Sequence, residues 1–83
     1  MYLEINQIKK LEDEKMQRQK YQVTITFENN DYMTTYFNAL DTQEIISHYN
    51  GYTMEYYNGE TTTAWAVSMK NMDTQKEEIY YYN

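Results

Sequence analysis

The sequence contains no cysteine and no proline, and its only glycines are Gly51 and Gly59. Without cysteine the chain has neither a disulfide framework nor a cysteine-based zinc site. No apolar run approaches the roughly 20 residues that cross a membrane, and the first residues lack a signal-peptide pattern. The richness in Asn, Tyr, Ile, Lys and Glu resembles coding by the AT-rich genome of a low-GC bacterium or its phage. We therefore expect a soluble protein in the cytoplasm of a bacterial host.

Basic residues are absent from a long internal region, because no Lys or Arg occurs between Tyr21 and Met69. The formal net charge is -6, but it is uneven. Residues 1–20 hold five cations and four anions, whereas residues 21–83 hold two cations and nine anions, a net of -7. Such an acidic body repels nucleic-acid phosphate and attracts basic surfaces. The alternative is solubility alone, although a merely solvated surface usually mixes both signs of charge.

The residue patterns predict one α+β domain over residues 1–83, with an N-terminal helix in residues 1–20 and an acidic α+β body in residues 21–83. Residues 3–19 have the loose apolar stripe of a helix. Residues 21–28 alternate apolar and polar side chains, as a half-buried strand does. Asn29, Asn30 and Asp31 favour a turn. Residues 32–38 then return as the second strand of a hairpin.

A short helix is predicted over residues 41–51, between two hairpins. Asp41 and Glu44 have the spacing of a capping box, and Gly51 fits the position after the last helical turn. A second hairpin is predicted over residues 52–69, with Asn58 and Gly59 as a two-residue turn at positive φ. Its return strand alternates, which assigns one common face to Thr61, Thr63, Trp65, Val67 and Met69. With residues 78–83 as an edge strand, we expect an antiparallel sheet of four to five strands.

The sequence carries no pattern typical of an enzyme. It has no glycine-rich phosphate loop and no nucleophile elbow. The only histidine, His48, adjoins Ser47 in the predicted helix, where neighbouring side chains point about 100° apart and form no dyad. Asp41 and Glu44 are better explained as helix caps than as metal ligands. We therefore expect no catalytic residue, no metal and no cofactor.

The aromatic residues favour protein binding over nucleic-acid binding. Aromatic strands that stack bases also need interleaved Lys or Arg for the phosphates, and residues 21–69 offer none. Eleven tyrosines exceed what so small a core can hide, and tyrosine is enriched at protein interfaces. The predicted partner is a basic DNA-binding groove of another protein, in which carboxylates occupy phosphate positions. The predicted phosphate mimics are Glu28, Asp31, Asp41, Glu44, Glu55 and Glu60.

Residues 21–53, "YQVTITFENNDYMTTYFNALDTQEIISHYNGYT", resemble the short uracil-DNA glycosylase inhibitors of Bacillus phages. The shared order is a Tyr-x-Val-Thr strand, an acidic turn, a Tyr-rich strand and a short acid-capped helix that ends near Tyr, Asn and Gly. The resemblance implies a DNA mimic that encloses an apolar loop residue of the glycosylase, a residue that the enzyme otherwise inserts into DNA. It implies an apolar pocket built from Tyr36, Ile45, Ile46, Tyr49, Tyr52, Met54 and Tyr56.

Several alternatives remain open at this level. The family has an aromatic residue where this chain has Ile45, so the aromatic role passes to Tyr36, Tyr52 or Tyr56. Alternatively, Ile45 and Ile46 simply pack the helix on the sheet. The family is dimeric, and here either a second copy or the additional hairpin takes the second subunit's place. Two other functions fit the same composition: an anti-CRISPR or other phage inhibitor of a nucleic-acid machine, and a Tyr-rich self-assembling structural protein.

Overall fold

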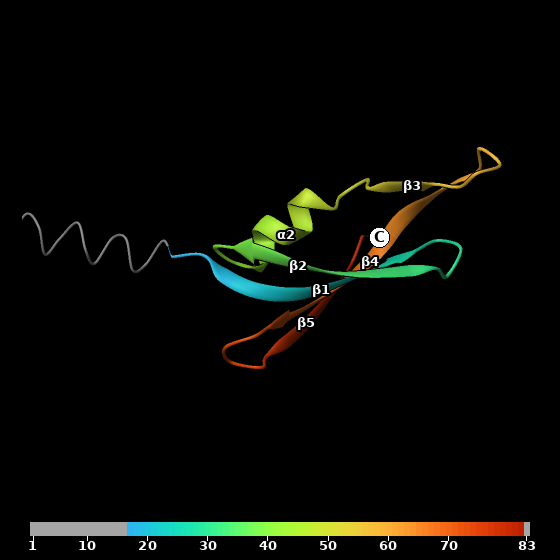
Figure 1. Ribbon diagram of the computed structural model, residues 1–83. Coiled ribbons are helices and arrows are strands. Elements are labelled where there is room, and N and C mark those ends of the chain that lie inside the picture. Colours follow the sequence, from blue (N-terminus) through green and yellow to red (C-terminus); the bar gives the residue numbers. More distant parts are fainter. Residues whose placement is uncertain (1–16, 83) are drawn as a thin grey trace, which may run out of the picture.

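The computed structural model describes residues 17–82. The described elements are, in order, β1 (Gln19–Phe27), β2 (Tyr32–Ala39), α2 (Thr42–His48), β3 (Thr53–Glu55), β4 (Thr61–Asn71) and β5 (Glu77–Tyr81). The strands form one curled antiparallel sheet that resembles half of a barrel, and α2 is the one helix among the described residues (Figure 1). No helix in this part of the chain is long and apolar enough to span a membrane.

The expected α+β class is wrong, because the described chain is mostly sheet with a single helix of seven residues. The helix expected over residues 3–19 lies outside the described residues except for its last three positions. There the expectation also fails, since Gln19 is already the first residue of β1. The two hairpins, the short helix between them and a final strand are present.

The strand order is β2-β1-β4-β3, and β5 also pairs with β4. β4 is therefore the central strand and has neighbours on both edges. One edge pairs with β1 over Ala64–Asn71. The other edge pairs first with β3, over Thr61–Thr63, and then with β5, over Ala66–Lys70. In Figure 1 β4 accordingly runs diagonally across the molecule, from β3 at one end to β5 at the other.

The core lies on one face of this sheet and beneath α2. The alternation predicted in β1 is confirmed, because Tyr21, Val23, Ile25 and Phe27 are buried while the polar residues between them are only partly so. Ala39, Ala64, Val67 and Met69 join them from β2 and β4, and Ile45 and Tyr49 join from α2 and its C-terminal cap. The Tyr82 hydroxyl donates to the Ile46 carbonyl at 2.7 Å and ties the end of the chain to α2.

The prediction that alternate residues of β4 share one face along the whole strand is wrong, because the alternation of its side chains reverses at Trp65. Thr26 of β1 pairs with Ala66, but Phe27 pairs with Ala64, so the register shifts by one residue across Trp65. An extra residue of this kind reverses the alternation of side chains beyond it. Thr62 and Ala64 are therefore buried on the same side as Val67 and Met69. Trp65 lies on the outer face, stacked on Tyr81 with ring centroids 5.3 Å apart.

The first two hairpins turn through three-residue loops of the same geometry. In the first, the Phe27 amide donates to the Asp31 carbonyl at 2.8 Å and Asn30 has φ 73. In the second, the Tyr56 amide donates to the Glu60 carbonyl at 2.9 Å and Gly59 has φ 84. This is a tight turn followed by one left-handed residue. The predicted two-residue turn at Asn58-Gly59 is therefore wrong, since only Gly59 has positive φ.

Replacing Ile45 by alanine leaves a cavity in the core, because the side chain is fully buried. We expect Ile45→Ala to lower the free energy of unfolding by about 3 kcal/mol. Ile46→Ala is the matched control, and because Ile46 is only partly buried we expect a loss of roughly 1 kcal/mol. Urea denaturation followed by the fluorescence of Trp65 measures both. Equal losses would contradict the placement of Ile45 in the core.

Candidate functional site

The tips of the first two hairpins lie at the same end of the molecule (Figure 1). They do so because β4 pairs antiparallel with β1, and the Glu28 amide donates to the Thr63 carbonyl at 2.9 Å just beyond β1. Four of the six predicted phosphate mimics therefore gather on these two hairpins. We call them the tip carboxylates: Glu28, Asp31, Glu55 and Glu60.

Tyr56 connects the two tips through hydrogen bonds. Its hydroxyl donates to Asp31 Oδ2, and Asn29 Nδ2 donates to the Tyr56 oxygen at 2.6 Å. Asn29 also accepts the Asp31 amide on its own Oδ1 at 3.0 Å, which holds the first loop in shape. The hydrogen bond to Asp31 raises the pKa of Tyr56 above its ordinary 10.0. The Tyr56 hydroxyl therefore remains a proton donor at neutral pH.

A shallow depression opens between the two tips. Its volume is about 480 Å³, and it is lined by Asn29, Asp31, Tyr56, Tyr57, Asn58 and Glu60. A second depression shares Tyr56 and Tyr57 with it and adds Glu55. Tyr57 stands fully exposed at the tip of the second hairpin. The site thus combines two aromatic rings with carboxylates, and it lies open at the end of the molecule.

Charge is distributed unevenly along the strands. Among the described residues the cations are Arg18, Lys20, Lys70 and Lys76, and all lie toward the end where β1 begins and β4 ends. The opposite end carries the tip carboxylates and no cation, since residues 21–69 contain none. A cluster of a single sign produces a field that attracts basic partners.

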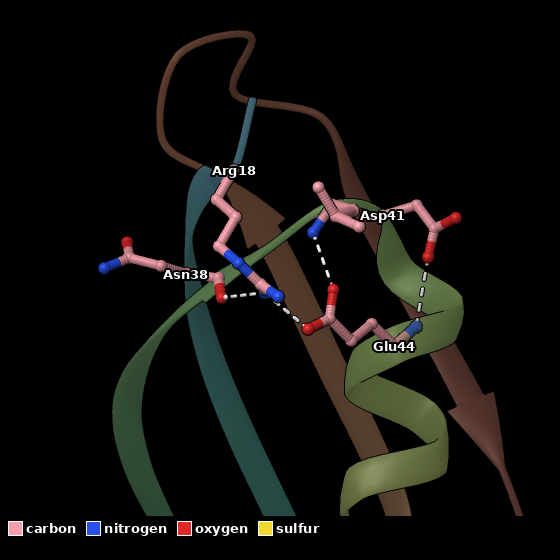
Figure 2. A network of polar contacts seen from close by, with 5 residues as sticks. Arg18, Asn38, Asp41 and Glu44 are labelled. Atoms are coloured by element: carbon pink, nitrogen blue, oxygen red, sulfur yellow. Dashed lines mark hydrogen bonds and ion pairs between the residues drawn. The ribbon is translucent and has the colours of Figure 1, made fainter. Parts of the chain in front are cut away.

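The other two predicted phosphate mimics, Asp41 and Glu44, lie at the far end of β1, roughly 25 Å away at about 3.3 Å per residue. Figure 2 shows them at the start of α2. Asp41 accepts the Glu44 amide at 3.0 Å, and Glu44 accepts the Leu40 amide at 2.8 Å. The predicted helix cap is thus confirmed, with Glu44 reaching one residue further back than a standard capping box.

Glu44 is also neutralised by a cation. Arg18 Nη1 lies 2.5 Å from Glu44 Oε1 and donates to the Asn38 carbonyl at 3.1 Å (Figure 2). The hydrogen bond from Arg18, followed by that from the Leu40 amide, lowers the pKa of Glu44 below its ordinary 4.5. The structure therefore does not bring Asp41 and Glu44 together with the tip carboxylates.

The seven residues expected to line one apolar pocket are spread over several places. Ile45 and Tyr49 are buried in the core, and Ile46 and Met54 pack against it. Tyr52 lies at the core's border, with its ring centroid 5.2 Å from that of Tyr49. Tyr36 is exposed on the outer face of β2, and only Tyr56 belongs to the hairpin tips. The interpretation of Ile45 as a core residue is therefore the one that the structure supports.

His48 packs beside aromatic rings at the end of α2. Its ring centroid lies 4.8 Å from that of Phe37 and 4.7 Å from that of Tyr49. In residues 17–82 no three His, Cys, Asp or Glu side chains gather in a manner that could hold a metal ion.

Sequence reasoning missed three polar or aromatic residues of the site: Asn29, Tyr57 and Asn58. The sequence does place each of these residues in a hairpin turn. When two hairpins are joined by antiparallel pairing of β1 with β4, their turns lie at the same end of the sheet. Arg18 was missed as the partner of Glu44, and nothing local indicates that contact. Comparisons with protein-family models, curated proteins and solved structures find no match for this chain.

The Arg18–Glu44 contact makes folding sensitive to acid. The pKa of Glu44 is lower in the folded chain than the ordinary 4.5, so the contact stabilises the fold above about pH 4.5 and is lost as pH falls through the folded-state pKa. We expect Glu44→Gln to flatten the acid-side decline in unfolding free energy. Glu78→Gln, at an exposed position of β5, is the matched control. Identical pH profiles for the two variants, measured by urea denaturation, would contradict this role of Glu44.

The link between the tips is open to a direct test. Because the hydrogen bond to Asp31 is the main cause of the raised pKa of Tyr56, Asp31→Asn should return that pKa toward 10.0. Ultraviolet difference absorbance of tyrosinate measures it, with Tyr56→Phe identifying the signal. Glu60→Gln should have a smaller effect, because Glu60 acts only by charge and is the weakest cause. An equal change in the Tyr56 pKa in both carboxylate variants would show that charge, and not the hydrogen bond from Tyr56 to Asp31, is the main cause of the raised pKa.

Proposed function

We propose that the chain is a small DNA mimic that inhibits a DNA-binding enzyme by occupying its basic DNA-binding groove. The observation that carries the proposal is the single-sign tip: four carboxylates and two tyrosines on adjoining hairpin loops, with every described cation at the other end. A DNA-binding groove presents Lys and Arg spaced for phosphates, and carboxylates on a narrow protruding edge can take the phosphate positions.

The two tyrosines have a separate role in this proposal. Charge steers association and selects the partner, whereas aromatic rings supply much of the binding energy at interfaces. Tyr57 is fully exposed and can insert between side chains of the groove without any rearrangement of the fold. Tyr56 is held by Asn29 and Asp31, so its ring is already oriented before binding. Orientation before binding lowers the entropic cost of association.

The first target to test is a bacterial uracil-DNA glycosylase, on the resemblance of residues 21–53 to the phage inhibitors of that enzyme. The setting that this implies is the cytoplasm of a phage-infected bacterium, and the action is stoichiometric binding without catalysis. Ile45 and Tyr49 are buried, so in this chain the inserted loop residue of the glycosylase would meet the depressions beside Tyr56 and Tyr57 instead. A CRISPR effector nuclease is the second target, because its DNA channel is also basic.

We expect the purified chain to block uracil excision by a bacterial glycosylase at about one equivalent. The double variant Glu28→Lys with Glu60→Lys should slow association roughly tenfold or more at low salt, because the two new cations cancel the charge of the two remaining tip carboxylates, Asp31 and Glu55. The matched control is Glu77→Lys with Glu78→Lys, which changes the net charge equally at exposed positions of β5. Stopped-flow mixing at two salt concentrations measures the rates.

Two results would contradict the proposal in different ways. Equal slowing by the tip and control variants would mean that net charge alone matters and that the tip is not the binding surface. Full glycosylase activity in a several-fold excess of the chain would eliminate this target. A DNA-cleavage assay with a CRISPR effector nuclease would then test the second target.

A further inference from the structure

The face of the sheet opposite the core carries the only tryptophan of the chain. Trp65 is the extra residue of β4 at the shift of register, and a bulge of this kind re-aims a side chain. Its ring is stacked on that of Tyr81 in β5, with the two ring planes inclined by 30°. Trp65 is nevertheless 38% exposed and Tyr81 is 54% exposed. These two residues, which we call the aromatic pair, thus form a surface that is fixed in place and still open to a partner.

Carboxylates border the aromatic pair on the side of the hairpin tips. Thr61 and Thr63 lie on the same outer face of β4 as Trp65, because the residues between them are buried. Glu55 of β3 pairs with Thr61, and residues paired across strands share a face. The Glu28 amide donates to the Thr63 carbonyl at 2.9 Å, and Thr63 is roughly 7 Å along the strand from Trp65 at about 3.3 Å per residue. Two of the tip carboxylates are therefore within reach of a long side chain that contacts the aromatic pair.

The aromatic pair has no cation of its own among residues 17–82. In that part of the chain the one Lys or Arg that lies over an aromatic ring is Lys20, whose Nζ is 4.8 Å from the centroid of the Tyr36 ring. Tyr36 lies toward the cation-bearing end of the sheet, whereas the aromatic pair lies toward the acidic end. Tryptophan is the side chain whose ring attracts cations most strongly. A cation from another molecule is therefore attracted here by the ring and by the neighbouring carboxylates together.

We propose that the aromatic pair binds an arginine side chain of a partner protein, with the guanidinium stacked on Trp65 and its N–H groups directed to the Glu28 carboxylate. A guanidinium is planar and more weakly hydrated than an ammonium, so it stacks on a ring and still donates in its own plane to a carboxylate. A lysine supplies the charge without that geometry. An apolar partner is disfavoured, because it would remove water from Glu28 and Glu55 without pairing their charges.

The arginine site deepens the proposed function, and the identity of the partner rests on that function. Proteins that bind DNA contact phosphates with Arg and Lys along the walls of the groove. The aromatic pair adjoins the tips, so a protein that takes the tips into its groove can place an arginine of the groove wall on Trp65. This contact favours a groove lined by arginine over one lined by lysine, a distinction that carboxylates alone make only weakly.

Isothermal titration calorimetry of the full chain with short peptides tests the arginine site without any target enzyme. The probes are Arg-Gly-Arg-Gly-Arg and the same peptide with lysine or with citrulline in place of arginine. We expect the arginine peptide to bind roughly fivefold more tightly than the lysine peptide at low salt. The citrulline peptide has a similar shape without the charge and should not bind. The arginine peptide should also change the fluorescence of Trp65, which reports the contact because the chain has no other tryptophan.

Two variants locate the site. Trp65→Leu should abolish the preference for arginine, because it removes the ring and keeps the carboxylates. The matched control Tyr36→Leu removes an exposed ring toward the other end of the sheet and should keep the preference. Equal affinity of the native chain for the arginine and lysine peptides, an unchanged fluorescence of Trp65, or a preference that persists in Trp65→Leu would overturn the proposal.

The comparison of peptides on the native chain does not require any variant to fold. No enzyme is present in these titrations, so their outcome is independent of the glycosylase and nuclease assays. Loss of the arginine preference would leave the proposed inhibition untouched, and failure of the inhibition assays would leave the arginine site standing without its proposed partner.

Discussion

The antiparallel pairing of β1 with β4 is the interaction on which the rest of the structure depends. It joins two hairpins that are distant in sequence and places Val23 and Ile25 beside Met69 and Val67 in register. The core beneath α2 exists only because this pairing brings the apolar faces of both strands to one side. The same pairing sets the direction of both hairpins, and so it brings their loops to one end. Core and candidate site therefore have a single structural origin.

The arrangement of charge is unfavourable for folding, and it is the feature on which the proposed function rests. Four carboxylates on adjoining loops repel one another, and no cation among the described residues accompanies them. The hydrogen bonds from Tyr56 and Asn29 to Asp31 offset part of that repulsion locally. The described cations lie at the other end of the sheet, where Arg18 forms an ion pair with Glu44. Sites that bind other molecules commonly depart from what would stabilise the fold alone.

Local features of the fold were predictable from the sequence, and features that depend on distant pairing were not. The alternation in β1, the cap at Asp41 and the positive φ of Gly51 each follow from a few neighbouring residues. The change of face at Trp65 does not, because it arises from how β4 meets β1. For the same reason the six acidic residues could be recognised as a group, but their division between two ends of the sheet could not. Arg18 and Glu44 are 26 positions apart, and no local pattern links them.

The β1–β4 pairing also determines when the core can close during synthesis. Each hairpin closes a loop of a few residues, but Tyr21 pairs with Asn71, 50 positions later in the chain. Joining such distant segments costs more chain entropy and slows folding. As the polypeptide leaves the ribosome, the β1–β2 hairpin can form early, yet its apolar face has no cover until β4 has emerged. The nascent chain therefore carries an exposed apolar surface until β4 has been made, and only then can it acquire its native core.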